Sequence, residues 1–246
     1  MEGRVRVSLL RQTADPELAV ALAARLCYSP DGIGDLERGT GSEGAAALIR
    51  RILKLGHLSV LEHAVFSFGV EGISRAASHQ LVRHRVASYS QQSQRYVAAD
   101  EEFEHVVPPS IAARPELSGA FARAMRDAGK RYRELIARGI PAEDARFVLP
   151  NAAATRIIVT MNARELRHFF TLRCCLRAQW EIRGLAERML GLCRCAAPVL
   201  FEGCGPACLS GACPEGKLSC GRIREVRSAY RAWPAGEPQP RLPLPA

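Results

Sequence analysis

The chain has 246 residues, 48% of them hydrophobic, which is enough for a globular core in one or two domains. It contains no apolar run of about 18 residues and no apolar signal-peptide core, so we expect a cytoplasmic protein without a membrane span. The formal net charge is +9, which fits nucleic acid, nucleotides and anionic cofactors equally well. Only three of the basic residues are lysines, so a single arginine is weak evidence for an anion-binding site. The position of an arginine in the sequence is therefore more informative than its charge.

Patterns of apolar residues predict the secondary structure of the first part of the chain. In chain order we expect an edge strand at 4–9, a helix at 16–27, a loop at 29–41, a helix at 42–55 and a strand at 64–71. Asp15 is the expected N-cap of the first helix, and Gly56 is expected to end the second. Ser59 and Glu62 have the spacing of a capping box.

The second part of the chain is predicted to be mainly helical. In chain order we expect a long connection at 100–114, a helix at 115–138, a short helix at 141–149, a buried strand at 154–161, a helix starting at 162 and a helix at 179–195. Asn162 is the expected N-cap of the penultimate helix, with Glu165 at the capping-box position. Residues 222–246 are rich in Arg and Pro and are expected to be disordered.

The stretch 74–97 has an unusual composition, because no acidic residue lies between Glu71 and Asp100. It carries arginines, histidines, serines and glutamines, which together require an anion from outside the segment. Ser74 is the expected N-cap of a helix over 75–85, followed by a loop and extended chain. Since guanidinium groups bind phosphate oxygens two at a time, the stretch predicts a phosphate-binding cradle. The alternative is a solvated basic helix and loop.

The order of residues in this stretch resembles the signature of the flavin-dependent thymidylate synthases. Arg83-His84-Arg85 is followed after seven residues by Ser93 and then by Arg95. The segments His57-x-Ser59-x-x-Glu62-His63, ARFVLP around Arg146 and NARELRHFFTLR from Asn162 resemble further family motifs. The resemblance covers residues 45 to 200 and, with the predicted elements, implies an α+β domain at 1–202. Its mixed, mainly antiparallel sheet would be flanked by helices, with a long C-terminal helix and a Cys-rich and Pro-rich tail at 203–246.

The resemblance also implies the ligands and the residues that hold them. It implies methylation of dUMP at uracil C5, with a methylene group from 5,10-methylenetetrahydrofolate and hydride from reduced FAD that NADPH regenerates. The implied flavin-binding residues are His57, Ser59, Arg83, His84, Arg85, Gln91, Asn162, Arg164 and His168. The implied dUMP-binding residues are Gln80, Arg83, Gln91, Gln92, Ser93, Gln94, Arg95, Arg146 and Arg173. Arg173 and Ser93 are the candidate catalytic residues, and a homotetramer with shared active sites is expected.

Two positions need separate comment. A serine nucleophile requires an adjacent base and an orienting acid, and the stretch around Ser93 has no acid, so we predict that Ser93 orients the pyrimidine. Many family members have Glu where this chain has Gln91, which puts a proton-handling role at that position in doubt. An arginine beside the uracil imide favours its ionised form, which is the role expected of Arg173.

Other interpretations of the same residues remain open. Arg146 alone could be a surface residue, and Asn162 could be only a helix cap. The group His57, Glu62 and His63 lacks the one-turn spacing of two metal ligands on a helix, so no metal is expected there. At the level of the whole chain, the rivals are a nucleic-acid-binding module and a structural α+β protein with an arginine-rich surface. The first would show steep salt dependence, and neither would bind a chromophore.

Nine cysteines are many for a chain without a secretion signal. Five lie in helical patterns and are expected to pack in the interior. The other four, Cys204, Cys208, Cys213 and Cys220, fall among Gly and Pro and could bind zinc as thiolates, although their spacing lacks the paired two-residue gaps of common zinc sites. Free thiols and inter-cysteine bonds are the alternatives.

Overall fold

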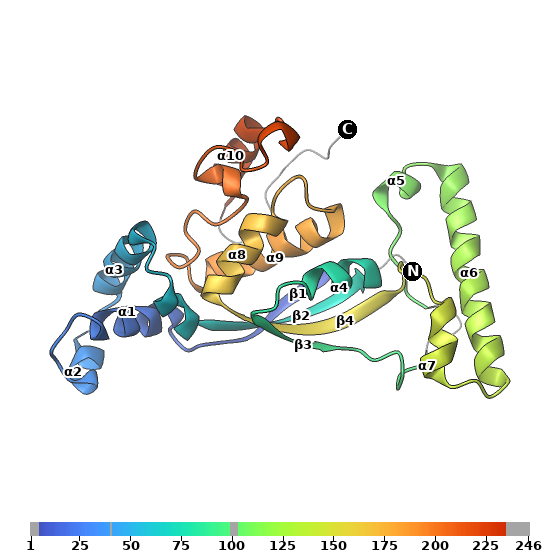
Figure 1. The fold of residues 1–246 in the computed structure, drawn as a ribbon, viewed down its shortest axis with the longest axis horizontal. Coiled ribbons are helices and arrows are strands. Elements are labelled where there is room, and N and C mark those ends of the chain that lie inside the picture. The colour runs from blue at the N-terminus through green and yellow to red at the C-terminus, as the bar shows by residue number, and fades with distance from the viewer. Residues whose placement is uncertain (1–4, 40, 99–102, 235–246) are drawn as a thin grey trace. The chain divides into compact units, whose positions relative to one another are not determined.

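The structure, a computed structural model, describes residues 5–39, 41–98 and 103–234 (Figure 1). Its strands are β1 (Arg6–Gln12), β2 (Val65–Ser74), β3 (Ala87–Gln91) and β4 (Ala154–Asn162). Its α-helices are α1 (Pro16–Leu26), α2 (Ile33–Arg38), α3 (Ser42–Leu55), α4 (Arg75–Leu81), α5 (Pro109–Ala112), α6 (Pro115–Ala137), α7 (Ala142–Ala145), α8 (Ala163–Arg173), α9 (Trp180–Ala196) and α10 (Ile223–Arg231). Short 3-10 helices are η1 (Ser59–His63), η2 (Arg146–Val148), η3 (Ala207–Leu209) and η4 (Gly216–Leu218).

The strands form one antiparallel sheet in the order β1-β2-β4-β3 within the described residues. The expected α+β class is therefore confirmed, and β1 is an edge strand as predicted, although Arg4 lies outside the described residues. β4 is not buried throughout, since buried residues alternate along it with less buried ones. Alternation of this kind is usual for an antiparallel strand with one face on the core. In the described part of the chain, no helix is long and apolar enough to cross a membrane.

The chain divides into two compact units. The first combines residues 1–6, 69–83 and 89–158, and the second combines residues 7–68, 84–88 and 159–246. In the first unit α6 packs against α5 and α7. In the second unit α8 contacts both α9 and η1. The core of the second unit includes the ring of Phe201, whose centroid lies 5.3 Å from that of Phe66 and 6.0 Å from that of Phe170. The predicted division at residue 202 stays a prediction.

Several helix boundaries differ from the predicted ones. α4 ends at Leu81 rather than Arg85, because the hydroxyl of Tyr89 donates to the Leu81 carbonyl, which a longer helix would use internally. Gln80 is therefore helical, but Arg83 and His84 are not, and the three do not share a helix surface.

Two predicted irregular segments contain helices. α2 lies in the expected loop 29–41, and α10 lies in the expected disordered tail. α10 forms because Val226 and Tyr230 are one turn apart and both buried, and the Tyr230 ring packs against Trp233 at 5.6 Å. Residues 235–246, the remainder of that tail, lie outside the described residues.

The predicted helix caps have mixed outcomes. Asn162 Oδ1 accepts the Glu165 N–H at 2.9 Å, and Ser74 Oγ accepts the Ala77 N–H at 3.0 Å, so both N-caps are confirmed. Asp15 lies at the N-cap position of α1, but its side chain makes no capping bond, and its φ is 43°. The capping box that the spacing of Ser59 and Glu62 would allow does not form, since the segment is the 3-10 helix η1 without a side-chain cap.

Candidate active site

A buried histidine organises the polar contacts of the second unit. His84 is 5% exposed, and its Nδ1 lies 3.1 Å from Glu165 Oε1. Its Nε2 accepts a hydrogen bond from Arg173 Nε at 3.0 Å. The Phe169 ring packs edge-on against the imidazole at a centroid distance of 4.8 Å. We call these four residues, His84, Glu165, Phe169 and Arg173, the His84 cluster.

Three partners of His84 in this cluster come from α8, and their spacing explains why they meet it. Glu165, Phe169 and Arg173 are four residues apart in succession, so they lie along one face of the helix. The Asn162 cap fixes the start of α8, which places Glu165 in the first turn. Glu165 therefore pairs with His84 rather than completing the predicted capping box.

These contacts determine the protonation of His84. An ionised carboxylate can only accept, so Nδ1 carries the proton toward Glu165, and Nε2 is the acceptor for Arg173. Burial lowers the pKa of His84, and the positive charge of Arg173 lowers it further, while the bond to Glu165 opposes both. The ring is therefore held neutral in a single tautomer, between an acid and a guanidinium.

A cavity of about 810 Å³ lies beside this cluster in the second unit. Its polar lining includes Asn162, Arg164, Glu165, Arg167 and His168. Three of these, Asn162, Arg164 and His168, are predicted flavin-binding residues, so the structure brings them to one cavity. Arg164 makes a 2.6 Å ion pair with Glu62, which also lines the cavity.

The remaining predicted flavin-side residues have other surroundings. His57 is exposed, and its Nδ1 is hydrogen-bonded to the Tyr28 hydroxyl at 3.2 Å. Neither His57 nor Ser59 is among the residues that line the cavity, although Leu58 between them is. Arg85 belongs to the second unit and is exposed, whereas Arg83 belongs to the first.

A second group of predicted residues lies in the first unit, around Gln91 at the end of β3. Gln91 Nε2 donates to Ser78 Oγ and to Thr155 Oγ1, both at 3.1 Å. Both hydroxyl residues are buried, so the Gln91 side chain is anchored by the interior. The backbone N–H of Gln92 donates to the Arg156 carbonyl at 2.9 Å, which continues the attachment of this segment to β4.

Cationic side chains gather near the same segment. Arg95 Nε donates to Glu143 Oε2 at 2.7 Å, and Arg146 Nε donates to the Glu143 carbonyl at 3.0 Å. Burial lowers the pKa of Arg75, and the charge of Arg146 lowers it further, so these two guanidinium groups repel each other. Ser93 Oγ accepts the backbone N–H of Arg95 at 3.1 Å. Two adjacent cations of this kind favour an anionic ligand.

The sequence alone does not indicate the roles of three residues. Arg75 has no individual role in the sequence, although it lies in the acid-free segment that predicts an anion site. Glu165 has only a capping-box position there, and Phe169 has no predicted role. The spacing of Glu165, Phe169 and Arg173 signals a shared face, but their common partner His84 is distant in sequence.

Comparison with known proteins gives the family. The family described as "Thymidylate synthase complementing protein" matches residues 8–199. The chain belongs to this family of flavin-dependent thymidylate synthases. The flavin-dependent thymidylate synthase of Geobacter sulfurreducens is 58% identical over 92% of this chain and 98% of the relative. That of Clostridium tetani is 45% identical over 92% of this chain and 97% of the relative.

A solved structure agrees with the family assignment. The UMP/dUMP methylase PolB from Streptomyces cacaoi, in a crystal structure bound with 5-Br dUMP, superposes with a TM-score of 0.71. It is 27% identical in sequence, and the match covers 82% of this chain and 96% of that chain. The resemblance found in the sequence is therefore confirmed, both for the family and for the fold.

Proposed function

We propose that the chain is a thymidylate synthase that converts dUMP to dTMP by reductive methylation at uracil C5, without an enzyme nucleophile. The methylene group would come from 5,10-methylenetetrahydrofolate, and NADPH would reduce the flavin. The observation that carries the proposal is the family match over residues 8–199, which contains every candidate site residue from His57 to Arg173.

The residues of the second unit suit a flavin. A volume of about 810 Å³ is within the usual range for ligand and cofactor sites. Asn162 and His168 offer neutral hydrogen-bonding groups, and Arg164 and Arg167 offer positive charge for a diphosphate. When bound, FAD would supply the hydride, while the protein supplies position and field. His57, Ser59, Arg83, His84, Arg85 and Gln91 complete the proposed flavin-binding set.

The residues of the first unit suit a nucleotide monophosphate. Arg146 is our candidate for the phosphate together with Arg83 and Arg95, and the repulsion between Arg75 and Arg146 supports an anion beside them. Gln80, Gln92 and Gln94 would add hydrogen bonds, and Ser93 would orient the pyrimidine. Gln91 is fixed to two buried hydroxyls, which suits it to shape the site rather than to move a proton.

Arg173 is the proposed partner of the uracil imide. A cation at the N3–C2 edge favours the ionised imide, which makes C5 electron-rich. Because His84 is held neutral at Nε2, its hydrogen bond orients Arg173 without neutralising the guanidinium charge. Glu165 supports this arrangement from the far side of the imidazole.

The remaining parts of the proposal rest on the family resemblance. We include a homotetramer with active sites shared between subunits, a cytoplasmic location, and no nucleic-acid or membrane partner.

Visible absorbance of the purified protein tests the proposal against its two rivals. A flavoenzyme should be yellow, release about one FAD per chain on denaturation, and bleach with NADPH under anaerobic conditions. A nucleic-acid-binding module would be colourless and would lose affinity steeply with salt. A colourless protein that also fails to take up added FAD would contradict the proposal.

A further inference from the structure

One wall of the cavity of about 810 Å³ beside the His84 cluster comes from a part of the chain beyond the family match. On this side the cavity is lined by Gly203, Cys204, Gly205, Ala207 and Ser210. We call residues 203–211 the cavity wall. The match to the family ends at residue 199, so the motifs that carry the family resemblance do not include the cavity wall. Its position must be explained from the contacts of this chain itself.

The cavity wall has little secondary structure of its own. In the described structure it contains only the short 3-10 helix η3. Gly203 and Gly205 have positive φ values of 69° and 151°. A Cβ on Gly205 would lie 2.5 Å from Leu209 Cδ1 and 2.7 Å from Tyr230 Cε1, so the backbone there lies directly against α10. The cavity wall therefore depends on side chains from other elements for its position.

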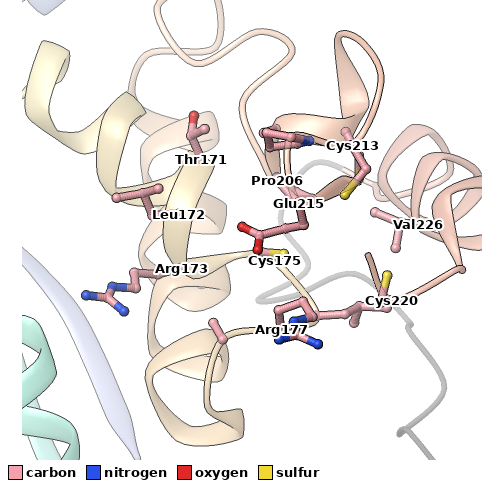
Figure 2. A pocket seen from close by; sticks show the side chains of 15 residues that line it. Thr171, Leu172, Arg173, Cys175, Arg177, Pro206, Cys213, Glu215, Cys220 and Val226 are labelled. Atoms are coloured by element: carbon pink, nitrogen blue, oxygen red, sulfur yellow. The ribbon is translucent and has the colours of Figure 1, made fainter. Parts of the chain in front are cut away.

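A second cavity, of about 340 Å³, lies against the same segment (Figure 2). Ala207 lines both cavities, while its neighbours Pro206 and Cys208 line only the smaller one. In Figure 2, Thr171 and Leu172 of α8 border this space on one side, and Pro206 borders it on the other. The cavity wall is therefore not packed solidly on both faces, and it has room to move. Hydrogen bonds must hold it where close packing does not.

The cysteines that line the smaller cavity do not supply this support as a metal site. Cys175, Cys208, Cys213 and Cys220 carry free thiols. In the part of the chain that the structure describes, no three His, Cys, Asp or Glu side chains are grouped so that they could hold a metal ion. The zinc alternative for the tail cysteines therefore gains no support.

Two guanidinium groups bind backbone carbonyls of this segment. Arg167 of α8 donates through Nη1 to the Leu200 carbonyl at 2.5 Å, just before the cavity wall. Arg227 of α10 donates through Nε to the Cys208 carbonyl at 2.8 Å and through Nη2 to the Gly211 carbonyl at 2.7 Å. Because one planar guanidinium group bridges two carbonyls, it fixes the direction of the chain as well as its position.

Arg227 can hold the cavity wall because α10 is itself anchored to α9. The Tyr230 hydroxyl of α10 donates to Glu187 Oε1 of α9 at 3.3 Å. The guanidinium group of Arg194, also in α9, lies 4.8 Å from the ring centroid of Trp233, just beyond the end of α10. The helix that carries Arg227 is therefore held at its C-terminal end by two side-chain contacts.

We propose that Arg227 is a positioning residue for the cofactor, because it holds the cavity wall in the place that FAD binding requires. Arg227 is not one of the described residues that line the larger cavity, so it acts through the cavity wall. The inference rests on the proposed function, in which this cavity takes the flavin. Without the two carbonyl bonds, the cavity wall is in its binding position for only part of the time. The apparent affinity for FAD falls by that fraction, since only the competent state binds.

The FAD affinity of the full-length protein tests this inference. Flavin fluorescence titration of the apoprotein, at a temperature at which all variants are folded, should give a dissociation constant at least about tenfold higher for Arg227→Gln than for the native chain. Arg227→Lys should recover part of the loss, since an ammonium group can still donate to one of the two carbonyls. A purely structural role would lower the unfolding temperature without changing the FAD affinity of the folded protein.

The matched control is Arg224→Gln, one turn earlier on the same helix. Arg224 is exposed and forms no hydrogen bond or ion pair with any other described residue, so this variant should bind FAD as the native chain does. Folded Arg227→Gln with native FAD affinity would overturn the inference and leave the proposed function standing. A native chain that takes up no FAD would instead overturn both.

A second measurement needs no variant and covers the case in which Arg227→Gln does not fold. Hydrogen exchange of the native chain, followed by mass spectrometry of its peptides, should slow in residues 203–211 when FAD is added. Slower exchange there would support the cavity wall as part of the flavin site. Unchanged exchange in these residues at saturating FAD would overturn the inference.

Discussion

Arg173 Nε donates to His84 Nε2 at 3.0 Å, although 89 residues separate the two in sequence. The bond joins the Arg-His-Arg motif to the last turn of α8, and Glu165 holds the opposite side of the same ring. His84 therefore links the two segments that carry the family resemblance. Its neutral form is the one that this geometry requires.

The first prediction concerns the pH dependence of stability at His84. Its pKa is lowered in the folded state by burial and by Arg173, so the unfolded chain binds the proton more readily. The corresponding stability is fully present above the ordinary histidine pKa of about 6.5 and is lost as the pH falls toward the folded-state pKa. Urea unfolding from pH 8 to pH 5 should show this loss in the native chain and less of it in His84→Gln. Equal pH dependence in both would contradict the prediction.

Glu187 should give the opposite dependence. This glutamate of α9 is 6% exposed and accepts the Tyr230 hydroxyl at 3.3 Å, and burial raises its pKa to about 7. Its stabilising contribution is full below the ordinary carboxyl pKa and is lost as the pH rises through about 7. Glu187→Gln should therefore gain stability relative to the native chain between pH 5 and pH 8, by on the order of 3 kcal/mol. The exposed Glu134→Gln is the control and should show no such gain.

Replacement of Gln91 by glutamate, the acid that the family resemblance implies at this position, should cost less stability than replacement by alanine. Gln91→Ala removes the partner of two buried hydroxyls, Ser78 and Thr155, and should cost about 1–3 kcal/mol in the free energy of unfolding. In Gln91→Glu the Thr155 hydroxyl can rotate and donate to the carboxylate, whereas the Ser78 hydroxyl already donates to the Arg75 carbonyl at 2.9 Å, so part of the pairing is kept and the cost should be smaller. Thermal unfolding of both variants decides the matter, and a larger loss for Glu than for Ala would refute this account.

Ser93→Ala should retain measurable turnover with weaker dUMP binding. The Ser93 hydroxyl oxygen accepts the Arg95 N–H, and among the described residues no histidine or carboxylate hydrogen-bonds it. A nucleophilic serine would need such a base. Steady-state kinetics should show a raised KM for dUMP with kcat reduced less. Abolished chemistry with unchanged dUMP binding would show that Ser93 has a covalent role.

Much of the fold could be predicted from local signals. The Ser74 and Asn162 caps, Gly56 at the end of α3, and the amphipathic pattern of α6 each depend on residues close in sequence. The end of α4 could not be predicted in this way, because it depends on the Tyr89 hydroxyl, which reaches back to Leu81. α10 had a local signal in Val226 and Tyr230, but the Arg-rich and Pro-rich composition of the tail outweighed it.

The candidate site could likewise be predicted only where the signal is local in the sequence. The residue types in the acid-free stretch predict an anion site, and the adjacent charges of Arg75 and Arg146 agree with that prediction. The partners of His84 could not be predicted, because the spacing within α8 does not reveal what the helix face contacts.

Formation of dTMP by the purified protein tests the central claim most directly. Protein supplied with FAD, NADPH, dUMP and 5,10-methylenetetrahydrofolate should yield dTMP, identified by mass spectrometry of the nucleotides. Arg173→Ala should lower kcat/KM by at least about a hundredfold, while Arg177→Ala, a change four residues away on the turn after α8, should leave it nearly unchanged. A flavin-loaded, NADPH-reducible protein that forms no dTMP would contradict the account.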